Sequence, residues 1–512
     1  MRYIFIYLLI LLSNLGASQN TFDAIMQRKH MKKDLQKFYD IREVANSGVY
    51  KYRTKAQIDS IYQWAYEEIE SSTTLGDFYN IICKITDFEG SAHNTTYLPE
   101  KVDDSIDKEA EGYFPFMIKL VEEHWVCNNS NIAIPMGSRI VRINGVDMNE
   151  IIPKLYKYYT TDGFNITGKQ LGINFSFPWY YRMNYGKQDQ FKITYIDENN
   201  TENTLTVKSI SFEDYHKQRA KRHSKSSDYL YYSNPNEFEE SGGLYYSNIL
   251  NDSTAILTIN SFAIGWGAGD PVHKKYVNFL DSIFTQFKYK SIKHLIVDVR
   301  YNAGGTGPND IETVSFLVQK PLNDVKQAWV SCGKLPNVGM LDIPWYQKPF
   351  VNFAIRKEVR CSLVQRNDGR FFYEDFQIVE PKQNVFSGTV YLLISPRTAS
   401  AATLFGAAVA GNTTNTIIIG EETLGGYYGH NGILPISYVL PKSKISFGFS
   451  VVNLDQNVPQ KTNQPFGSGI RPNFEIKQSY ADFLNNEDTV MKFTMNLIKT
   501  KKNGSLQNID VN

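Results

Sequence analysis

Cysteine is scarce in this chain of 512 residues, and neither sign of charge dominates. The four cysteines form no Cys-x-x-Cys pair and no spacing typical of metal ligands; they are Cys83, Cys127, Cys332 and Cys361. The 54 basic and 53 acidic residues leave a formal net charge of +1, and there is no dense basic stripe. We therefore predict no metal site, and the charge gives no reason to expect a nucleic-acid partner.

Long apolar runs are missing beyond the first residues. At the N-terminus, Arg2 precedes an apolar run over residues 3–12, and small residues follow at 16–18. This order is typical of a cleaved signal peptide over residues 1–18. Because the run is too short to span a bilayer, we predict export to a periplasm or the outside, without stable membrane insertion. Export permits disulfides, and four cysteines allow three pairings that the sequence does not rank.

The upstream part of the chain changes character along its length. Residues 19–110 predict an N-terminal helical cap, because apolar residues recur at helical spacing, as in Ile58, Ile61, Tyr62, Ala65 and Ile69. Residues 111–210 are richer in strand patterns. Within them, I-P-M-G-S-R-I-V-R-I-N-G-V at 134–146 resembles part of a PDZ-like domain, a module that binds extended peptides at a sheet edge. Residues 211–242, rich in charge, serine and tyrosine, predict a linker or flap.

A strand, a tight turn and a helix of small residues follow one another in V-Y-L-L-I-S-P-R-T-A-S-A-A-T-L-F-G-A-A-V-A at 390–410. The helix is predicted to begin at Ser400. Backbone N–H groups at a helix start have no intrahelical acceptor and favour negative charge, so a hydroxyl there suits a nucleophile beside an oxyanion hole. The plainer alternative is that Thr398 or Ser400 only caps the helix.

A second unit of this kind lies upstream. The segment H-L-I-V-D-V-R-Y-N-A-G-G-T-G at 294–307 predicts a buried strand that opens into a glycine-rich turn, followed by a helix from Asn309 to Lys320. Two such units predict an α/β layer structure in which both turns leave the carboxyl ends of strands. Gly304 and Gly305 either serve turn geometry alone or let the backbone approach a substrate carbonyl.

Together these segments resemble the C-terminal processing and tricorn-core serine peptidases. The matching stretches, in the order of that family, are D-V-R-Y-N-A-G-G at 298–305, T-A-S-A-A at 398–402, G-E-E-T-L-G-G at 420–426, L-P-K-S at 440–443 and G-S-G-I-R-P at 467–472. The resemblance implies an α/β fold with a crotonase-like ββα catalytic core, which we place at residues 243–480. Residues 481–512 are predicted to form a C-terminal helix and polar tail. The resemblance also implies Ser400 as the nucleophile, with the amides of Gly304 and Ala401 in the oxyanion hole.

The predicted base departs from the processing branch of this family. That branch uses a lysine, and the corresponding position here is Gly426. The stretch G-S-A-H-N at 90–94 instead resembles the histidine segment of the tricorn-like branch, which implies His93 as the base. A neutral imidazole suits this role because its unperturbed pKa is about 6.5. His430, in G-G-Y-Y-G-H-N-G, is an alternative base or a substrate contact.

The acid that would orient the histidine is not readable from the sequence. The tricorn-like branch has a glutamate where this chain has Phe466, and Glu421, Glu422 and Asp455 are left as possibilities. We expect an exported serine peptidase that acts on peptides or unfolded proteins and needs no metal or organic cofactor. The missing lysine and glutamate support one alternative, a pseudopeptidase that binds peptides or protein tails without cleaving them.

Overall fold

Three helices near the N-terminus share one apolar core in the computed structural model, which describes residues 21–129, 133–223 and 243–502. They are α2 (Arg28–Ala45), α3 (Lys55–Ile69) and α4 (Leu75–Phe88). Helices α3 and α4 each begin with a capping box. The side chain of the threonine before the helix accepts a hydrogen bond from the backbone amide of the third helical residue, whose side chain accepts one from the threonine amide. The apolar residues whose spacing predicts a helix are buried along α3.

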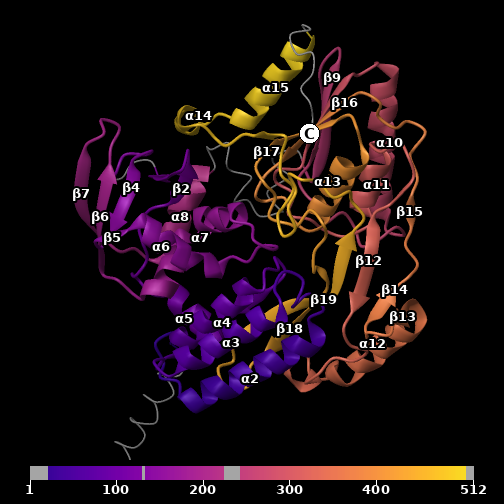
Figure 1. Cartoon of the computed structure of the whole chain (residues 1–512). Coiled ribbons are helices and arrows are strands. Elements are labelled where there is room, and N and C mark those ends of the chain that lie inside the picture. The colour runs from indigo at the N-terminus through magenta and orange to yellow at the C-terminus, as the bar shows by residue number, and fades with distance from the viewer. Residues whose placement is uncertain (1–20, 130–132, 224–242, 503–512) are drawn as a thin grey trace, which may run out of the picture.

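These helices pack directly on a sheet of the downstream chain (Figure 1). The sheet is antiparallel and contains β1 (Thr95–Tyr97), β12 (Val325–Val330), β13 (Leu363–Gln365), β14 (Phe371–Tyr373), β18 (Ile433–Val439) and β19 (Ser446–Gln456). Phe38 of α2 lies against Phe447 of β19, with ring centroids 4.7 Å apart. The short strand β1 pairs with β19, so the segment just before β1 is held against the downstream half of the chain.

A second antiparallel sheet lies within residues 118–208 and has its own apolar core. In spatial order it contains β2 (Ile118–Val121), β3 (His124–Cys127), β4 (Arg139–Ile143), β6 (Gln190–Ile196) and β7 (Glu202–Lys208), and β5 (Val146–Asp147) pairs with β4. Helices α6 (Met148–Leu155) and α7 (Thr167–Tyr185) contribute to the same core. The likeness of this region to a PDZ domain stays a prediction.

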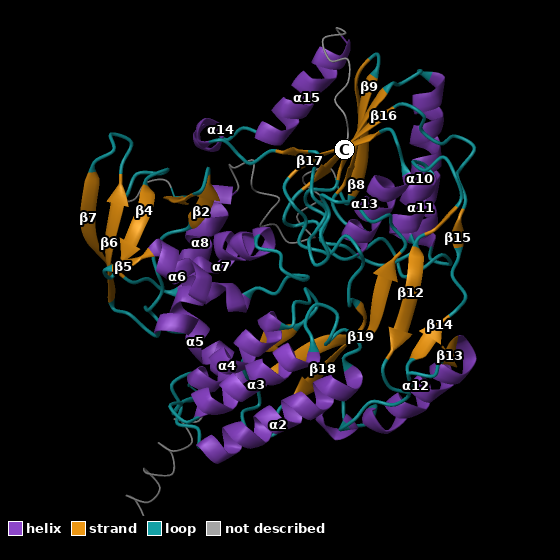
Figure 2. Cartoon of the chain, viewed as in Figure 1, coloured by secondary structure: helices purple, strands orange, loops and turns teal. Residues whose placement is uncertain are grey.

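The remaining large sheet is mostly parallel and has helices on both faces (Figure 2). Its spatial order is β20 (Phe474–Glu475), β17 (Thr416–Gly420), β16 (Thr389–Ile394), β10 (His294–Asp298), β9 (Thr254–Ile259) and β8 (Tyr245–Asn251), and only β8 is antiparallel to its neighbour. Helices α10 (Pro271–Tyr289), α11 (Asn309–Ser315) and α13 (Ala401–Asn412) share the core of one face, and α15 (Thr489–Lys502) packs on the other. The expected mixed α/β fold is confirmed.

Helix α11 ends at Ser315, before the predicted end at Lys320. The residues that follow, from Phe316 to Val318, are buried in the same core as α10. Pro321 also disfavours a helical backbone at the residue before it. The apolar run that resembles the end of a helix is therefore a buried turn.

Some sequence predictions fall outside the described residues. These include the signal peptide at 1–18, residues 224–242 of the predicted linker and residues 503–512 of the tail. The described part of the linker contains α8 (Phe212–His223).

All four cysteines are free thiols. Within the described ranges, no helix is long and apolar enough to cross a membrane, and no cluster of three or more potential His, Cys, Asp or Glu ligands is found.

A buried ion pair fixes the end of α4 against α2. Arg42 and Glu89 have side chains that are each 1% exposed, and the guanidinium donates to both carboxylate oxygens. The side-chain amides of Asn46 and Asn94 donate to the same carboxylate, at 3.2 and 3.0 Å. Because Asn94 directly follows His93, this ion pair also holds the segment that contains the predicted base.

We expect Glu89→Gln to destabilise the fold strongly. The change keeps the shape of the side chain but leaves the Arg42 charge buried without a counter-ion, which typically costs about 3–5 kcal/mol. Thermal unfolding followed by circular dichroism measures the loss. Glu70→Gln is the matched control, because it breaks an exposed pair with Lys32 and should leave the unfolding temperature almost unchanged. Equally small shifts in both variants would contradict this expectation.

Candidate active site

Ser400 lies where β16 turns into α13, at the position just before the helix. Its φ of 51° and ψ of −128° form a strained backbone conformation that residues with side chains rarely adopt, at a cost of about 1–3 kcal/mol. The Ser400 hydroxyl makes no capping hydrogen bond to the helix. The Thr398 hydroxyl is used elsewhere, since it donates to the Val299 carbonyl and accepts from the Ser395 amide. The capping alternative is therefore wrong for both residues.

The structure brings His93 to Ser400. The His93 Nε2 atom lies 3.2 Å from Ser400 Oγ, within hydrogen-bond distance. His93 reaches this position because β1, which begins two residues later, pairs with β19. Burial lowers the pKa of His93 below its ordinary value, while the charge of Asp162 acts in the opposite direction. A neutral imidazole at this distance can accept the proton of the hydroxyl.

Asp162 is a site residue that the sequence analysis missed. Its carboxylate oxygens accept hydrogen bonds from the backbone amides of Ala92, at 2.8 Å, and Gly426, at 3.0 Å. The side chain is fully buried; burial raises the pKa of Asp162, while His93 and the two amides act to lower it. No motif marks this residue. The one sequence signal is the Asp-Gly pair at 162–163, which predicts only a turn.

His430 stacks on His93 and makes no hydrogen bond to Ser400. The two imidazole rings have centroids 5.1 Å apart and planes inclined by 28°. Both ring nitrogens of His430 are buried without a hydrogen-bond partner in the described ranges, and burial holds the pKa of His430 well below its ordinary value. The structure therefore places His430 as a buried ring packed against His93 and not as a hydrogen-bond partner of Ser400.

The three acids left open by the sequence have other surroundings. Glu422 accepts a hydrogen bond from a backbone amide at 2.8 Å, and Asp455 forms an ion pair with a lysine at 2.6 Å. Glu421 lines a separate cavity. The carboxylate whose charge acts on the pKa of His93 is that of Asp162.

The predicted glycine turn lies against Ser400. A Cβ atom added to Gly304 would come within 2.7 Å of Ser400 Cβ, and the φ of Gly304 is 110°, so only glycine fits there. The Ala401 amide is the first of α13 and therefore has no intrahelical acceptor. The Gly304 amide, in contrast, donates to Asn302 Oδ1 at 2.9 Å. Of the two predicted oxyanion donors, the Ala401 amide therefore lies at a helix start, whereas the Gly304 amide already donates a hydrogen bond within its own loop.

Ser400 and His93 line a cavity of about 660 Å³. Strand β1 and the segment 157–160 also contribute to its lining. Several aromatic side chains face the same space, namely Tyr79, Tyr158, Tyr159 and Phe175. A cavity of this size can hold side chains of a bound peptide.

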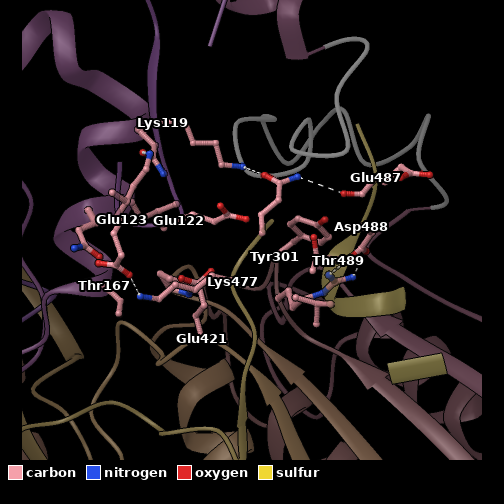
Figure 3. Close-up of a pocket in the computed structure, with 18 residues that line it drawn as sticks. Lys119, Glu122, Glu123, Thr167, Tyr301, Glu421, Lys477, Glu487, Asp488 and Thr489 are labelled. Carbon is pink, nitrogen blue, oxygen red and sulfur yellow. Dashed lines mark hydrogen bonds and ion pairs between the residues drawn. The ribbon is translucent and has the colours of Figure 1, made fainter. Parts of the chain in front are cut away.

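A second cavity of about 90 Å³ lies between β2, α7 and the segment 477–490 (Figure 3). Arg300 lines it and forms paired hydrogen bonds with Asp298 and with Asp488, at 2.7 to 3.0 Å. The carbonyl of Arg300 accepts a hydrogen bond from the Ser395 hydroxyl. Arg300 lies shortly before the glycine turn at Gly304, and Asp488 directly precedes α15. Their hydrogen bonds therefore link this turn to the start of α15.

The chain is similar in sequence or fold to several known proteins. Residues 253–476 match the profile of peptidase family S41. No curated protein was found to match the sequence. The crystal structure of mature CPAF superposes with a TM-score of 0.58 at 12% identity, covering 94% of this chain and 99% of that one. Mature CPAF in complex with lactacystin gives 0.56 at 11% identity, covering 93% and 99%. At these identities the structural likeness concerns the fold.

Gly304→Ala should reduce kcat/KM by about a hundredfold, because the added methyl group collides with Ser400 Cβ and displaces the hydroxyl. Steady-state kinetics on an unfolded protein substrate measures this change. Gly269→Ala is the control, since an added Cβ there meets no atom within 4 Å. Activity of Gly304→Ala equal to that of the control would show that the turn does not constrain Ser400.

Proposed function

We propose that Ser400 and His93 perform the chemistry of a serine-type peptidase of family S41, the family whose profile matches residues 253–476, and that peptides are its substrates. The observation that carries this proposal is the distance of 3.2 Å between His93 Nε2 and Ser400 Oγ. In the proposed reaction, Ser400 Oγ attacks a peptide carbonyl while His93 Nε2 accepts its proton. The imidazolium then delivers this proton to the leaving amine.

The start of α13 supports the oxyanion in this proposal. The Ala401 amide and the positive end of the helix dipole both favour negative charge next to Ser400. The Gly304 amide can contribute only by sharing or exchanging its hydrogen bond with Asn302 Oδ1. We therefore assign the main oxyanion contact to Ala401.

We propose that Asp162 assists His93 through its charge. Its oxygens bond the amides of Ala92 and Gly426, and the Nδ1 atom of His93 has no hydrogen-bond partner in the described ranges. The carboxylate therefore stabilises the imidazolium across space instead of through a direct hydrogen bond. Stacking on His430 then helps to set the plane of the His93 ring.

Two further features belong to this proposal. The apolar run and small residues at 1–18 support export to a periplasm or the outside.

We also propose that the PDZ-like region serves as a spacer instead of a peptide receptor. In support, the Leu120 amide of its edge strand β2 already donates to Asn174 Oδ1 of α7, and the adjoining cavity of about 90 Å³ is too small for a peptide strand.

Ser400→Ala should abolish peptidase activity while preserving the fold. Removal of a catalytic serine typically lowers kcat by about a millionfold. A fluorophosphonate probe should label the parent and the control Ser362→Ala, which alters an exposed serine outside the site, but not Ser400→Ala. Unchanged cleavage of an unfolded substrate by Ser400→Ala would refute the assignment of the nucleophile.

The pH dependence of kcat/KM should have its acidic limb below the ordinary imidazole pKa of about 6.5, because burial lowers the pKa of His93. Asp162→Asn should move this limb to still lower pH, since the carboxylate charge that favours the imidazolium is lost, and should reduce kcat as well. Glu422→Gln is the control and should leave the limb in place. A limb that moves upward in Asp162→Asn would contradict the proposed role.

A further inference from the structure

The cavity that contains Ser400 has an uneven distribution of charge. Its described lining includes two cationic side chains, those of Lys157 and Arg397, beside the neutral imidazole of His93, and no aspartate or glutamate. The chain as a whole has nearly equal numbers of basic and acidic residues. A cavity lined by one sign of charge attracts ligand groups of the opposite sign.

Lys157 is a partly buried basic group of this lining. It belongs to the short helix η1 (Tyr156–Tyr158), and its ammonium group lies 5.0 Å from the centroid of the Tyr158 ring. Its Nζ atom donates a hydrogen bond to Asn184 Oδ1 at 2.7 Å. This acceptor is neutral, and no carboxylate of the described residues forms an ion pair with Lys157.

The charge of Lys157 is therefore only partly compensated. Burial lowers its pKa to about 8, with a smaller lowering effect from Lys84 and opposing effects from the Cys83 thiol and from Glu68. Cys83 and Lys84 belong to α4, and Glu68 belongs to α3. An ammonium group has three N–H donors, so donors beyond the one bonded to Asn184 can reach a ligand.

Aromatic rings form the wall of the cavity beside Lys157. The rings of Tyr79 and Tyr158 lie nearly parallel, with centroids 6.4 Å apart. The hydroxyl of Tyr158 donates to Asn80, and that of Tyr79 faces the Thr96 carbonyl at 3.5 Å. The Tyr158 ring also stacks on the ring of Tyr180, with centroids 5.4 Å apart, so packed aromatic rings hold this wall of the cavity in place beside Lys157.

We propose that Lys157 selects peptide substrates that place the carboxylate of an aspartate or glutamate side chain in this cavity, near the bond that Ser400 attacks. This inference rests on the proposed function, because it assumes that the cavity holds the substrate. The carboxylate pairs with the Lys157 ammonium and offsets the cost of burying that charge. The carboxylate at a substrate's C-terminal end has the same chemistry and is distinguished by experiment.

The test uses fluorogenic peptides that differ only by glutamate or glutamine at single positions around the cleaved bond. At one position, the parent should prefer the glutamate peptide by about ten- to a hundredfold in kcat/KM, the gain expected from a hydrogen bond to a charged group. Lys157→Met should abolish this preference, so that both peptides are cleaved with equal kcat/KM, whereas Lys157→Arg should keep part of it. Lys154→Met, on the exposed side of α6, should behave as the parent. Equal kcat/KM for the two peptides in the parent would overturn the proposal.

Two further arms separate the possible explanations. The ratio of glutamate to glutamine cleavage should fall as the pH rises past the pKa of Lys157, which burial lowers to about 8, because the ammonium charge is then lost. Each peptide is also made with a free and an amidated C-terminus. A preference that follows the free terminus instead of the glutamate would overturn the side-chain assignment.

Binding to the Ser400→Ala variant keeps this test independent of catalysis. Fluorescence anisotropy should show tighter binding of the glutamate peptide than of the glutamine peptide, and Lys157→Met in the same background should remove the difference. If the parent cleaves no peptide but the variant retains this binding difference, the proposed function fails and the carboxylate site stands. Equal binding of both peptides would overturn the carboxylate site even if the parent is an active peptidase.

Discussion

The buried carboxylate of Asp162 connects the parts of the candidate site. A carboxylate without solvent contact is costly unless hydrogen bonds and opposite charge compensate it, and here two backbone amides and the His93 ring do so. The next residues extend this contact, because the Gly163 amide donates to the Gly90 carbonyl and the Phe164 amide to the Gly467 carbonyl, both at 2.8 Å. One short segment therefore sets the spacing of three loops around Ser400.

The site combines residues from two distant parts of the chain. The stretch that matches the family profile contains Ser400 but not His93, which lies far upstream. The pairing of β1 with β19 and the ion pair between Arg42 and Glu89 bring the upstream part into place. The N-terminal helices are therefore part of the architecture of the site.

Turn residues and helical spacing in the sequence predict those features of the fold and the site that form within a short stretch of chain. The turn before α13, the glycine turn after β10 and the helical spacing in α3 can each be read from a short stretch of sequence. The end of α11 was predicted wrongly, because the burial of Phe316 to Val318 depends on contacts with α10. Asp162 was missed for a similar reason, since its partners Ala92 and Gly426 are neighbours only in the folded chain. The roles of Ser400, His93, Gly304 and Ala401 in catalysis stay predictions.

The pairing of Thr95–Tyr97 with residues 446–448 has a consequence for biosynthesis. A ribosome produces the imidazole of His93 long before the strand that holds it beside the hydroxyl. During that interval β1 has no partner, and the proposed base is remote from the proposed nucleophile. The proposed mechanism therefore implies that a polypeptide still lacking β19 is inactive, because the pairing that holds its base beside its nucleophile has not yet formed.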